Sequence, residues 1–153
     1  MGILTHTEWV TLPMRPRSLT TNNRAGSKRP RPAKESKMMR FLIVDDDERI
    51  REMIKTVVAD DSAVFFECGD GAQARARYAE HKPDWVLMDV AMPEMDGLTA
   101  TRQIMSDDPA ARIVIVTAHD SAAVRAEARG AGACSYMLKE NLFKLREILM
   151  TTA

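Results

Sequence analysis

The residues best suited to chemistry are carboxylates, one hydroxyl and one amine, and each closely follows a short apolar run. They are Asp45, Asp46, Asp47, Asp89, Thr117 and Lys139. Several carboxylates gathered in one crevice repel one another and raise one another's pKa values. A hard divalent cation removes that repulsion, and Mg²⁺ in proteins takes one or two carboxylates together with phosphate oxygens and water. The acids therefore predict a magnesium cradle, provided that the fold brings them together.

One carboxylate of such a set can also act as a nucleophile, because an aspartate can attack a phosphoryl group and form an acyl phosphate. Phosphoryl transfer depends mainly on positioning and on charge neutralisation. Lys139 offers an ammonium group and Thr117 a hydroxyl group for the phosphoryl oxygens. Together with a metal ion, these side chains form a complete set for phosphorylation of an aspartate.

The elements that must position these residues are short apolar runs that alternate with amphipathic segments. The predicted strands cover residues 41–44, 63–66, 85–88, 113–116 and 135–138. The predicted helices cover residues 50–58, 72–81, 98–105, 121–129 and 142–149. Buried strands that alternate with helices indicate an α/β fold with a parallel sheet covered on both faces. Sites in such sheets lie at the carboxyl ends of the strands, so the polar residues should converge at one edge.

Three local features can be predicted within the helices. The second helix should face the core through its alanines Ala72, Ala76 and Ala79. Asp47 should be a turn residue or the cap of the first helix rather than a metal ligand, and Gly130 should end the fourth helix.

The composition divides the chain into two parts, although its net charge is zero. Residues 1–40 hold nine basic and two acidic residues, a balance of +7, and residues 41–153 hold thirteen and twenty, a balance of −7. The prolines and polar residues of the first part predict a basic, Pro-rich, disordered tail over residues 1–38, followed by one domain over residues 39–153. No apolar run is long enough to span a membrane. The two cysteines suit a reduced compartment, where isolated thiols are usually buried, and predict a cytoplasmic protein.

Four runs of the sequence, each at the end of a predicted strand, resemble the receiver domain of two-component response regulators. They are residues 43–47 (IVDDD), 88–97 (MDVAMPEMDG), 116–118 (VTA) and 136–139 (YMLK). The resemblance covers residues 39 to about 150. It implies a flavodoxin-like fold, in which a doubly wound, five-stranded parallel sheet has the strand order 2-1-3-4-5.

The resemblance also implies which residues take part in the phosphorylation reaction. Asp89 would be the phosphoacceptor. Asp45, Asp46 and Asp89 would hold Mg²⁺, together with the backbone carbonyl of Ala91.

Further residues are implied to bind or respond to the phosphoryl group. Thr117 and Lys139 would contact its oxygens. Tyr136 would be the aromatic residue that turns inward when the hydroxyl of Thr117 moves toward the phosphate. Ala91 and His119, two residues after the phosphoacceptor and the threonine, would line the path of the hydrolytic water.

The resemblance implies protein partners and no external substrate. A sensor histidine kinase or a phosphotransfer protein would dock near the first helix, beside Arg49, Arg51 and Glu52. Only fourteen residues follow Lys139, so we expect a stand-alone receiver, as in chemotaxis regulators, without a DNA-binding domain. Its downstream protein target would bind the face formed by the fourth helix, the fifth strand and the last helix, roughly residues 119–150.

One alternative is a phosphatase similar to the haloacid dehalogenase class, with Asp45 as the nucleophile. Asp45 and Asp47 match the Asp-x-Asp pattern of that class, and Thr117 and Lys139 could be its second and third motifs. That class needs a further acidic pair after the lysine, and the only acids there are Glu140 and Glu147. It would also leave Asp89 without a role.

A second alternative is a dinucleotide-binding domain. Residues 69–74 (GDGAQA) fit the Gly-x-Gly-x-x-Ala form between a predicted strand and a predicted helix. The motif follows the second strand rather than the first, and the acids after the first strand would repel a pyrophosphate. The five predicted strands are also fewer than the six of the usual dinucleotide-binding fold.

Overall fold

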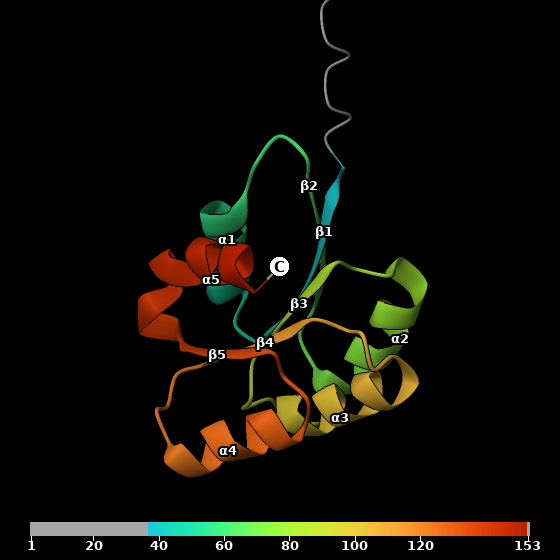
Figure 1. Ribbon diagram of the computed structural model, residues 1–153, viewed down its shortest axis with the longest axis vertical. Helices are drawn as coiled ribbons and strands as arrows, with labels where there is room; N and C mark the ends of the chain where they lie inside the picture. Colours follow the sequence, from blue (N-terminus) through green and yellow to red (C-terminus); the bar gives the residue numbers. More distant parts are fainter. Residues whose placement is uncertain (1–36, 153) are drawn as a thin grey trace, which may run out of the picture. The chain divides into compact units, whose positions relative to one another are not determined.

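Five parallel strands form the central sheet of the structure, a computed structural model that describes residues 37–152 (Figure 1). The strands are β1 (Met39–Val44), β2 (Ala63–Cys68), β3 (Trp85–Met88), β4 (Ile113–Thr117) and β5 (Ser135–Leu138). Their order in the sheet is β2-β1-β3-β4-β5. This confirms the predicted α/β fold and its strand order. The predicted tail lies, but for its last two residues, outside the described residues.

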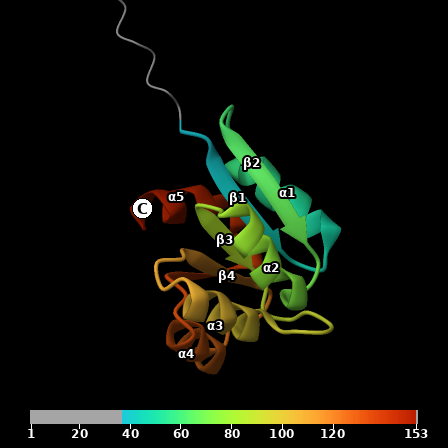
Figure 2. The same ribbon diagram turned by 90° about the vertical axis from the view of Figure 1, so that its right-hand side faces the viewer.

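Helices cover both faces of this sheet (Figures 1 and 2). They are α1 (Glu48–Val58), α2 (Gly71–His81), α3 (Gly97–Asp107), α4 (Ala122–Gly130) and α5 (Leu145–Thr151). Helices α1 and α5 lie on one face, and α2, α3 and α4 lie on the other. No helix within residues 37–152 is long and apolar enough to cross a membrane.

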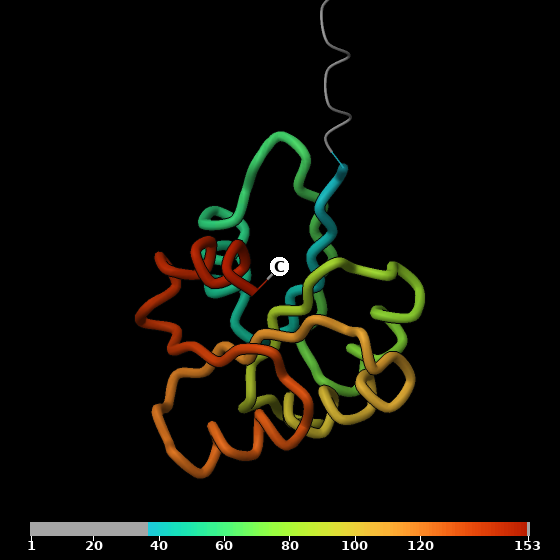
Figure 3. Tube along the Cα trace, in the orientation of Figure 1, coloured from blue at the N-terminus to red at the C-terminus, as the bar shows by residue number. Residues whose placement is uncertain are grey.

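The core consists of two apolar clusters, one on each face of the sheet. Alternate residues of each strand join opposite clusters, as Leu42 and Ile43 of β1 do. Strands β3 and β4 are buried along their whole length, which explains why they are continuous apolar runs in the sequence. The path of the chain shows that every β-to-α connection lies at the same edge of the sheet (Figure 3).

Polar side chains begin four of the helices close to this edge. The side chains of Asp47, Asp70, Asp96 and Ser121 accept hydrogen bonds from backbone amides in the first turns of α1, α2, α3 and α4. Such caps satisfy amides that have no partner inside the helix. The predicted capping role of Asp47 is therefore confirmed.

The predicted inward face of α2 is wrong. Its buried residues are Gly71, Ala74 and Tyr78, and the three alanines expected to face the core (Ala72, Ala76 and Ala79) are exposed. The ring of Tyr78 packs into the core while its hydroxyl donates a hydrogen bond of 2.7 Å to Asp108. A large aromatic ring buries much more area than a methyl group, so it determines which face of the helix turns inward.

Gly130 is the last residue of α4, as predicted, and the glycine with a left-handed φ of 98° is Gly132. Two other details differ from expectation. The last predicted helix is divided into a 3₁₀ helix (Lys139–Lys144) and α5. Cys68 is buried as expected, but Cys134 is exposed.

Candidate functional site

Three carboxylates meet at the carboxyl edge of the sheet. Asp45 and Asp46 follow β1, and Asp89 follows β3. The two strands are paired, with Val44 opposite Met88, so the residues that follow them are neighbours. Oxygens of the three carboxylates lie within 4.8 Å of one another. Asp45 and Asp89 are only 1% and 3% exposed, whereas Asp46 is open to solvent.

The ammonium group of Lys139, which follows β5, lies between the two buried carboxylates. Its Nζ is 2.7 Å from Oδ2 of Asp45 and 3.3 Å from Oδ2 of Asp89. Burial alone would lower the pKa of Lys139, but the bonds to Asp45 and Asp89 outweigh burial and raise the pKa. The lysine is therefore a stable cation inside the site.

The pKa of Asp89 is raised from 3.8 to about 6. Burial is the largest cause, the charge of Asp45 adds to it, and Lys139 opposes it. With every group ionised, three carboxylates and one ammonium leave a net charge of −2. One cation from the protein is therefore not enough to balance the site.

The donor set of this cluster fits a hard divalent cation. The residues offer carboxylate oxygens, which Mg²⁺ prefers. Oδ2 of Asp45 is buried and accepts no well-aligned hydrogen bond from the described residues, although Lys139 is close enough for an ion pair. A buried oxygen that lacks such a bond is costly unless a cation or donor satisfies it.

Thr117, predicted to bind the phosphoryl group, and Tyr136, predicted to respond to it, are both hydrogen-bonded to the backbone of His119. Thr117 is buried at the end of β4, and its Oγ1 accepts a hydrogen bond of 3.3 Å from the backbone amide of His119. Tyr136, half-buried in β5, donates a hydrogen bond of 2.9 Å to the carbonyl oxygen of His119. Movement at Thr117 therefore has a direct route to Tyr136 through the backbone of residue 119.

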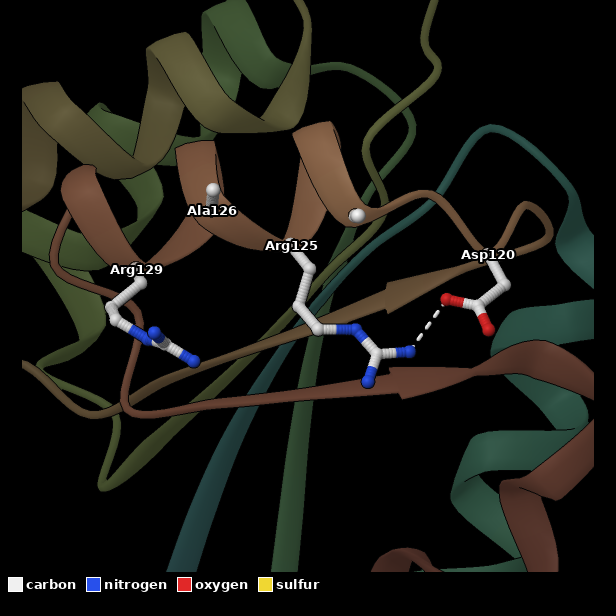
Figure 4. Close-up of a pocket in the computed structure, with 5 residues that line it drawn as sticks. Asp120, Arg125, Ala126 and Arg129 are labelled. Carbon is white, nitrogen blue, oxygen red and sulfur yellow. Dashed lines mark hydrogen bonds and ion pairs between the residues drawn. The ribbon is translucent and has the colours of Figure 1, made fainter.

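The ring of Tyr136 is also covered by an arginine of α4. The guanidinium carbon of Arg125 lies 5.0 Å from the ring centroid. Arg125 also pairs with Asp120 at 2.5 Å, as the close-up of the adjoining pocket shows (Figure 4). Arg129, which lines the same pocket, makes no ion pair with any residue that the structure describes.

The two predicted modulators of hydrolysis are both exposed. Ala91 lies in the loop between β3 and α3, and His119 lies in the loop between β4 and α4. Of the predicted site residues, the structure brings Asp45, Asp46, Asp89 and Lys139 together. It places Thr117 at the end of the strand next to β3, at the same edge.

Two residues that contribute to the site were missed in the sequence. Arg51 was expected on a docking surface, but its Nη1 donates a hydrogen bond of 2.7 Å to the backbone carbonyl of Asp45. Gly97 was treated only as part of a motif, but a methyl group at this position would lie 1.7 Å from the carbonyl oxygen of Asp89. Neither contact has a signal in hydrophobic periodicity. The glycine directly after Asp96 was the one available hint of a close backbone approach.

The geometry disfavours the phosphatase alternative. Asp47, the second acid of its Asp-x-Asp pattern, is exposed and caps α1. Among the described residues, the carboxylates close enough together to hold a metal ion are Asp45, Asp46 and Asp89, without Asp47.

The geometry also disfavours the dinucleotide alternative. The carboxylate of Asp70 accepts hydrogen bonds from the amides of Ala72 and Glu94 at 2.7 and 3.0 Å. Gly71 packs against the backbone carbonyl of Met95. A carboxylate and a loop therefore occupy the helix terminus at which a pyrophosphate would have to bind.

Comparisons with known proteins agree with this geometry. The family model of the response regulator receiver domain matches residues 41–150. A chemotaxis protein CheY of Listeria monocytogenes is 42% identical over 103 residues, covering 67% of this chain and 87% of the relative. A chemotaxis protein CheY of Bacillus subtilis is 43% identical over 101 residues, covering 65% and 84%. The solved structure of chemotaxis protein CheY4 of Vibrio cholerae has a TM-score of 0.70 at 25% identity, covering 76% and 99% of the two chains.

Proposed function

The chain belongs to the family of response regulator receiver domains, and on that premise we propose that it accepts a phosphoryl group on Asp89 in a Mg²⁺-dependent reaction. The donor is a sensor histidine kinase or a phosphotransfer protein. Members of this family are signalling proteins of two-component systems rather than classical enzymes. The observation that carries the proposal is the burial of Asp89 beside two further carboxylates and Lys139.

Asp89 is the proposed nucleophile. One of its carboxylate oxygens attacks phosphorus, the phosphorus–nitrogen bond to the donor histidine breaks, and the electron pair leaves on the imidazole nitrogen. Lys139 is close enough to exchange its contact with Asp89 for a contact with a phosphoryl oxygen. Thr117 offers its hydroxyl to another oxygen of the same group.

Asp45, Asp46 and Asp89 would hold the metal ion, with the backbone carbonyl of Ala91 as a further ligand. Bound there, Mg²⁺ supplies positive charge that offsets both the carboxylates and the phosphoryl oxygens. The carboxylates themselves must be ionised to bind it. The raised pKa of Asp89 is therefore expected to fall toward its ordinary value when the site is filled.

The output of phosphorylation is proposed to be a protein contact on the face of α4, β5 and α5. When Thr117 turns its hydroxyl toward the phosphoryl group, it gives up the amide of His119. The carbonyl of the same residue holds Tyr136, so the ring can then leave its position beside Arg125. A downstream protein would distinguish the two positions of Tyr136 on this face.

Ala91 and His119 are proposed to influence how long the phosphoryl group persists. Ala91 has no polar side-chain atom and leaves the approach to phosphorus open to water. His119 is exposed on the opposite loop, where a neutral imidazole could accept a proton from that water. We place the whole reaction in the cytoplasm, where free thiols such as Cys68 and Cys134 remain reduced.

Asp89→Asn tests the proposed phosphorylation site. The purified variant should gain no phosphoryl mass with acetyl phosphate and Mg²⁺, because an amide oxygen cannot form the acyl phosphate. Asp47→Asn is the matched control, since Asp47 is a nearby exposed acid outside the cluster, and this variant should be labelled like the wild type. Stoichiometric labelling of Asp89→Asn would contradict the assignment.

A further inference from the structure

Arg51 on α1 lies outside the cluster of Asp45, Asp46 and Asp89, but its side chain contacts the backbone of Asp45. Its Nη1 donates a hydrogen bond of 2.7 Å to the carbonyl oxygen of Asp45, and its Nε donates one of 3.1 Å to Oε1 of Glu67 on β2. The side chain is 19% exposed, whereas that of Arg49 is 93% exposed. Arg51 is therefore largely buried and makes two hydrogen bonds within the protein, whereas Arg49 is open to solvent.

The bond from Arg51 is one of three hydrogen bonds that hold Asp45 in place. Its amide donates to the carbonyl of Cys68 at 3.2 Å, and its Oδ1 accepts from the amide of Asp47 at 2.9 Å. Arg51 holds the carbonyl, so that the amide, the carbonyl and one carboxylate oxygen all have partners. The other oxygen, Oδ2, is the buried atom without a well-aligned hydrogen bond. The constraint on the backbone thus decides where Oδ2, the oxygen that pairs with Lys139, lies.

Glu67 in turn holds Arg51 in place. It accepts a second bond, of 3.0 Å, from Nζ of Lys55, one helical turn after Arg51. The planar guanidinium can serve Asp45 and Glu67 at once because its donors are held in a fixed fork, which an ammonium group lacks. Lys55 shares the partner Glu67 but makes no hydrogen bond to Asp45 among the described contacts.

We propose that Arg51 is a positioning residue for the metal site, which sets the affinity for Mg²⁺ by fixing the backbone of Asp45. This inference rests on the proposed function only in taking Asp45 as a metal ligand. The proposed effect of the hydrogen bonds can be distinguished from the effect of the charge of Arg51, because the two change the Mg²⁺ affinity in opposite directions. Arg51 is a cation close to a cation site, so its charge alone weakens Mg²⁺ binding, whereas its hydrogen bonds strengthen binding by holding the ligand in place.

Calorimetric titration of Mg²⁺ into chelator-treated, unphosphorylated full-length protein separates the two effects. Arg51→Ala should weaken Mg²⁺ binding about 10-fold, the lower end of the loss seen when a partner of a metal ligand is removed. Arg51→Lys keeps the charge, which disfavours Mg²⁺ binding, and loses the fork that holds the Asp45 carbonyl, so its affinity should also fall clearly below that of the wild type. Lys55→Ala, the matched control, should stay within about twofold of the wild type because it leaves the Asp45 carbonyl bond intact.

The Mg²⁺ dependence of labelling by acetyl phosphate provides the second measurement. Arg51→Ala should need more Mg²⁺ for half-maximal labelling and reach nearly the wild-type rate at saturation. An affinity equal to or tighter than that of the wild type in folded Arg51→Ala overturns the inference. So does a lower maximal rate at unchanged affinity. Where Arg51→Ala does not fold by circular dichroism, wild-type affinity in Arg51→Lys overturns it. Wild-type protein that binds no Mg²⁺ would instead refute the proposed function.

Discussion

Asp89 has conflicting requirements, because burial favours its neutral form while nucleophilic attack needs the charged form. Its pKa of about 6 reflects burial and the nearby Asp45, against which the single cation Lys139 is insufficient. Ionisation of Asp89 in the folded, metal-free protein therefore costs more free energy than ionisation of an ordinary aspartate. This makes the metal-free site sensitive to pH in a range where most carboxyl groups no longer titrate.

The metal-free protein should lose stability through Asp89 as pH rises from about 4 to about 6. A carboxyl group with a raised folded-state pKa stabilises the folded state fully below its unfolded pKa, and that contribution disappears above the folded pKa. The shift of about two units corresponds to a few kcal/mol, roughly 3 at most. In chelator, the unfolding free energy of Asp89→Asn minus that of the wild type should therefore grow over this range.

Urea unfolding at several pH values measures this difference. Taking the difference between the two proteins cancels the titration of acids elsewhere, such as Asp70, whose pKa is lowered by hydrogen bonds from backbone amides. A difference that is constant from about pH 4 to 7 would show that Asp89 titrates at its ordinary value.

The loop between β3 and α3 is held in place by hydrogen bonds to residues at the starts of α2 and α3. The amide of Gly97, the first residue of α3, donates a hydrogen bond of 2.9 Å to the carbonyl of Val90. Asp70 at the start of α2 accepts from the amide of Glu94 in the same loop. The segment that follows Asp89 is therefore held from two helices, and its position depends on the close approach of α3.

Gly97→Ala should disturb both stability and the site. The new methyl group would lie 1.7 Å from the carbonyl oxygen of Asp89, with other backbone and side-chain atoms within 3 Å. Overpacking of this kind typically costs about 1–3 kcal/mol, and the backbone of Asp89 has to move. We expect a lower unfolding free energy and weaker Mg²⁺ binding.

Gly130→Ala is the matched control for that substitution. Gly130 lies in α4, and a methyl group there would meet nothing within 4 Å. Replacing glycine by alanine in the middle of a helix stabilises it by about 0.5–1 kcal/mol, and at the last residue of α4 we expect a smaller gain. If both alanine variants behaved alike, the close approach of α3 would have no energetic importance.

The contact between α4 and β5 predicts a distinct role for Arg125. Its guanidinium covers Tyr136 and pairs with Asp120 (Figure 4), interactions worth about 0.5–1 kcal/mol each at such exposure. Arg125→Ala should therefore remove the cation that covers the ring and shift the ¹⁹F resonance of fluorotyrosine at position 136. Arg129→Ala removes an arginine from the same pocket and should leave the resonance in place. Equal spectra for wild type and Arg125→Ala would show that the arginine does not hold the ring.

Across the whole molecule, features that follow from periodicity and topology could be predicted from the sequence. The limits of β3 and β5 are those predicted, and the parallel-sheet rule alone predicted that Asp45 and Asp89 would meet. The face of α2 could not be predicted, because several alanines and one tyrosine compete and only packing decides between them. The contacts of Arg51 and Gly97 depend on backbone positions in three dimensions, which no spacing of residue types records.

The residues of the candidate site lie at the ends of four of the five strands, β1, β3, β4 and β5. The charge of the site should therefore affect the stability of the entire domain. Ligand that binds only the folded state stabilises it by about 2.7 kcal/mol at a hundredfold excess over the dissociation constant. For a domain of this size that free energy corresponds to a rise in melting temperature of roughly 10 °C. Millimolar Mg²⁺ should therefore raise the melting temperature of the unphosphorylated protein.

The appropriate comparison is NaCl at the same ionic strength, which screens exposed charges but reaches buried ones poorly. Asp46→Ala supplies the matched variant. Asp46 is the exposed member of the cluster, so its removal should leave the fold intact while it weakens the effect of Mg²⁺. A melting temperature that rises equally with NaCl and Mg²⁺, or equally in wild type and Asp46→Ala, would mean that the stabilisation is general screening. The cluster would then not be a specific metal site, and the stability of the domain would be independent of its occupancy.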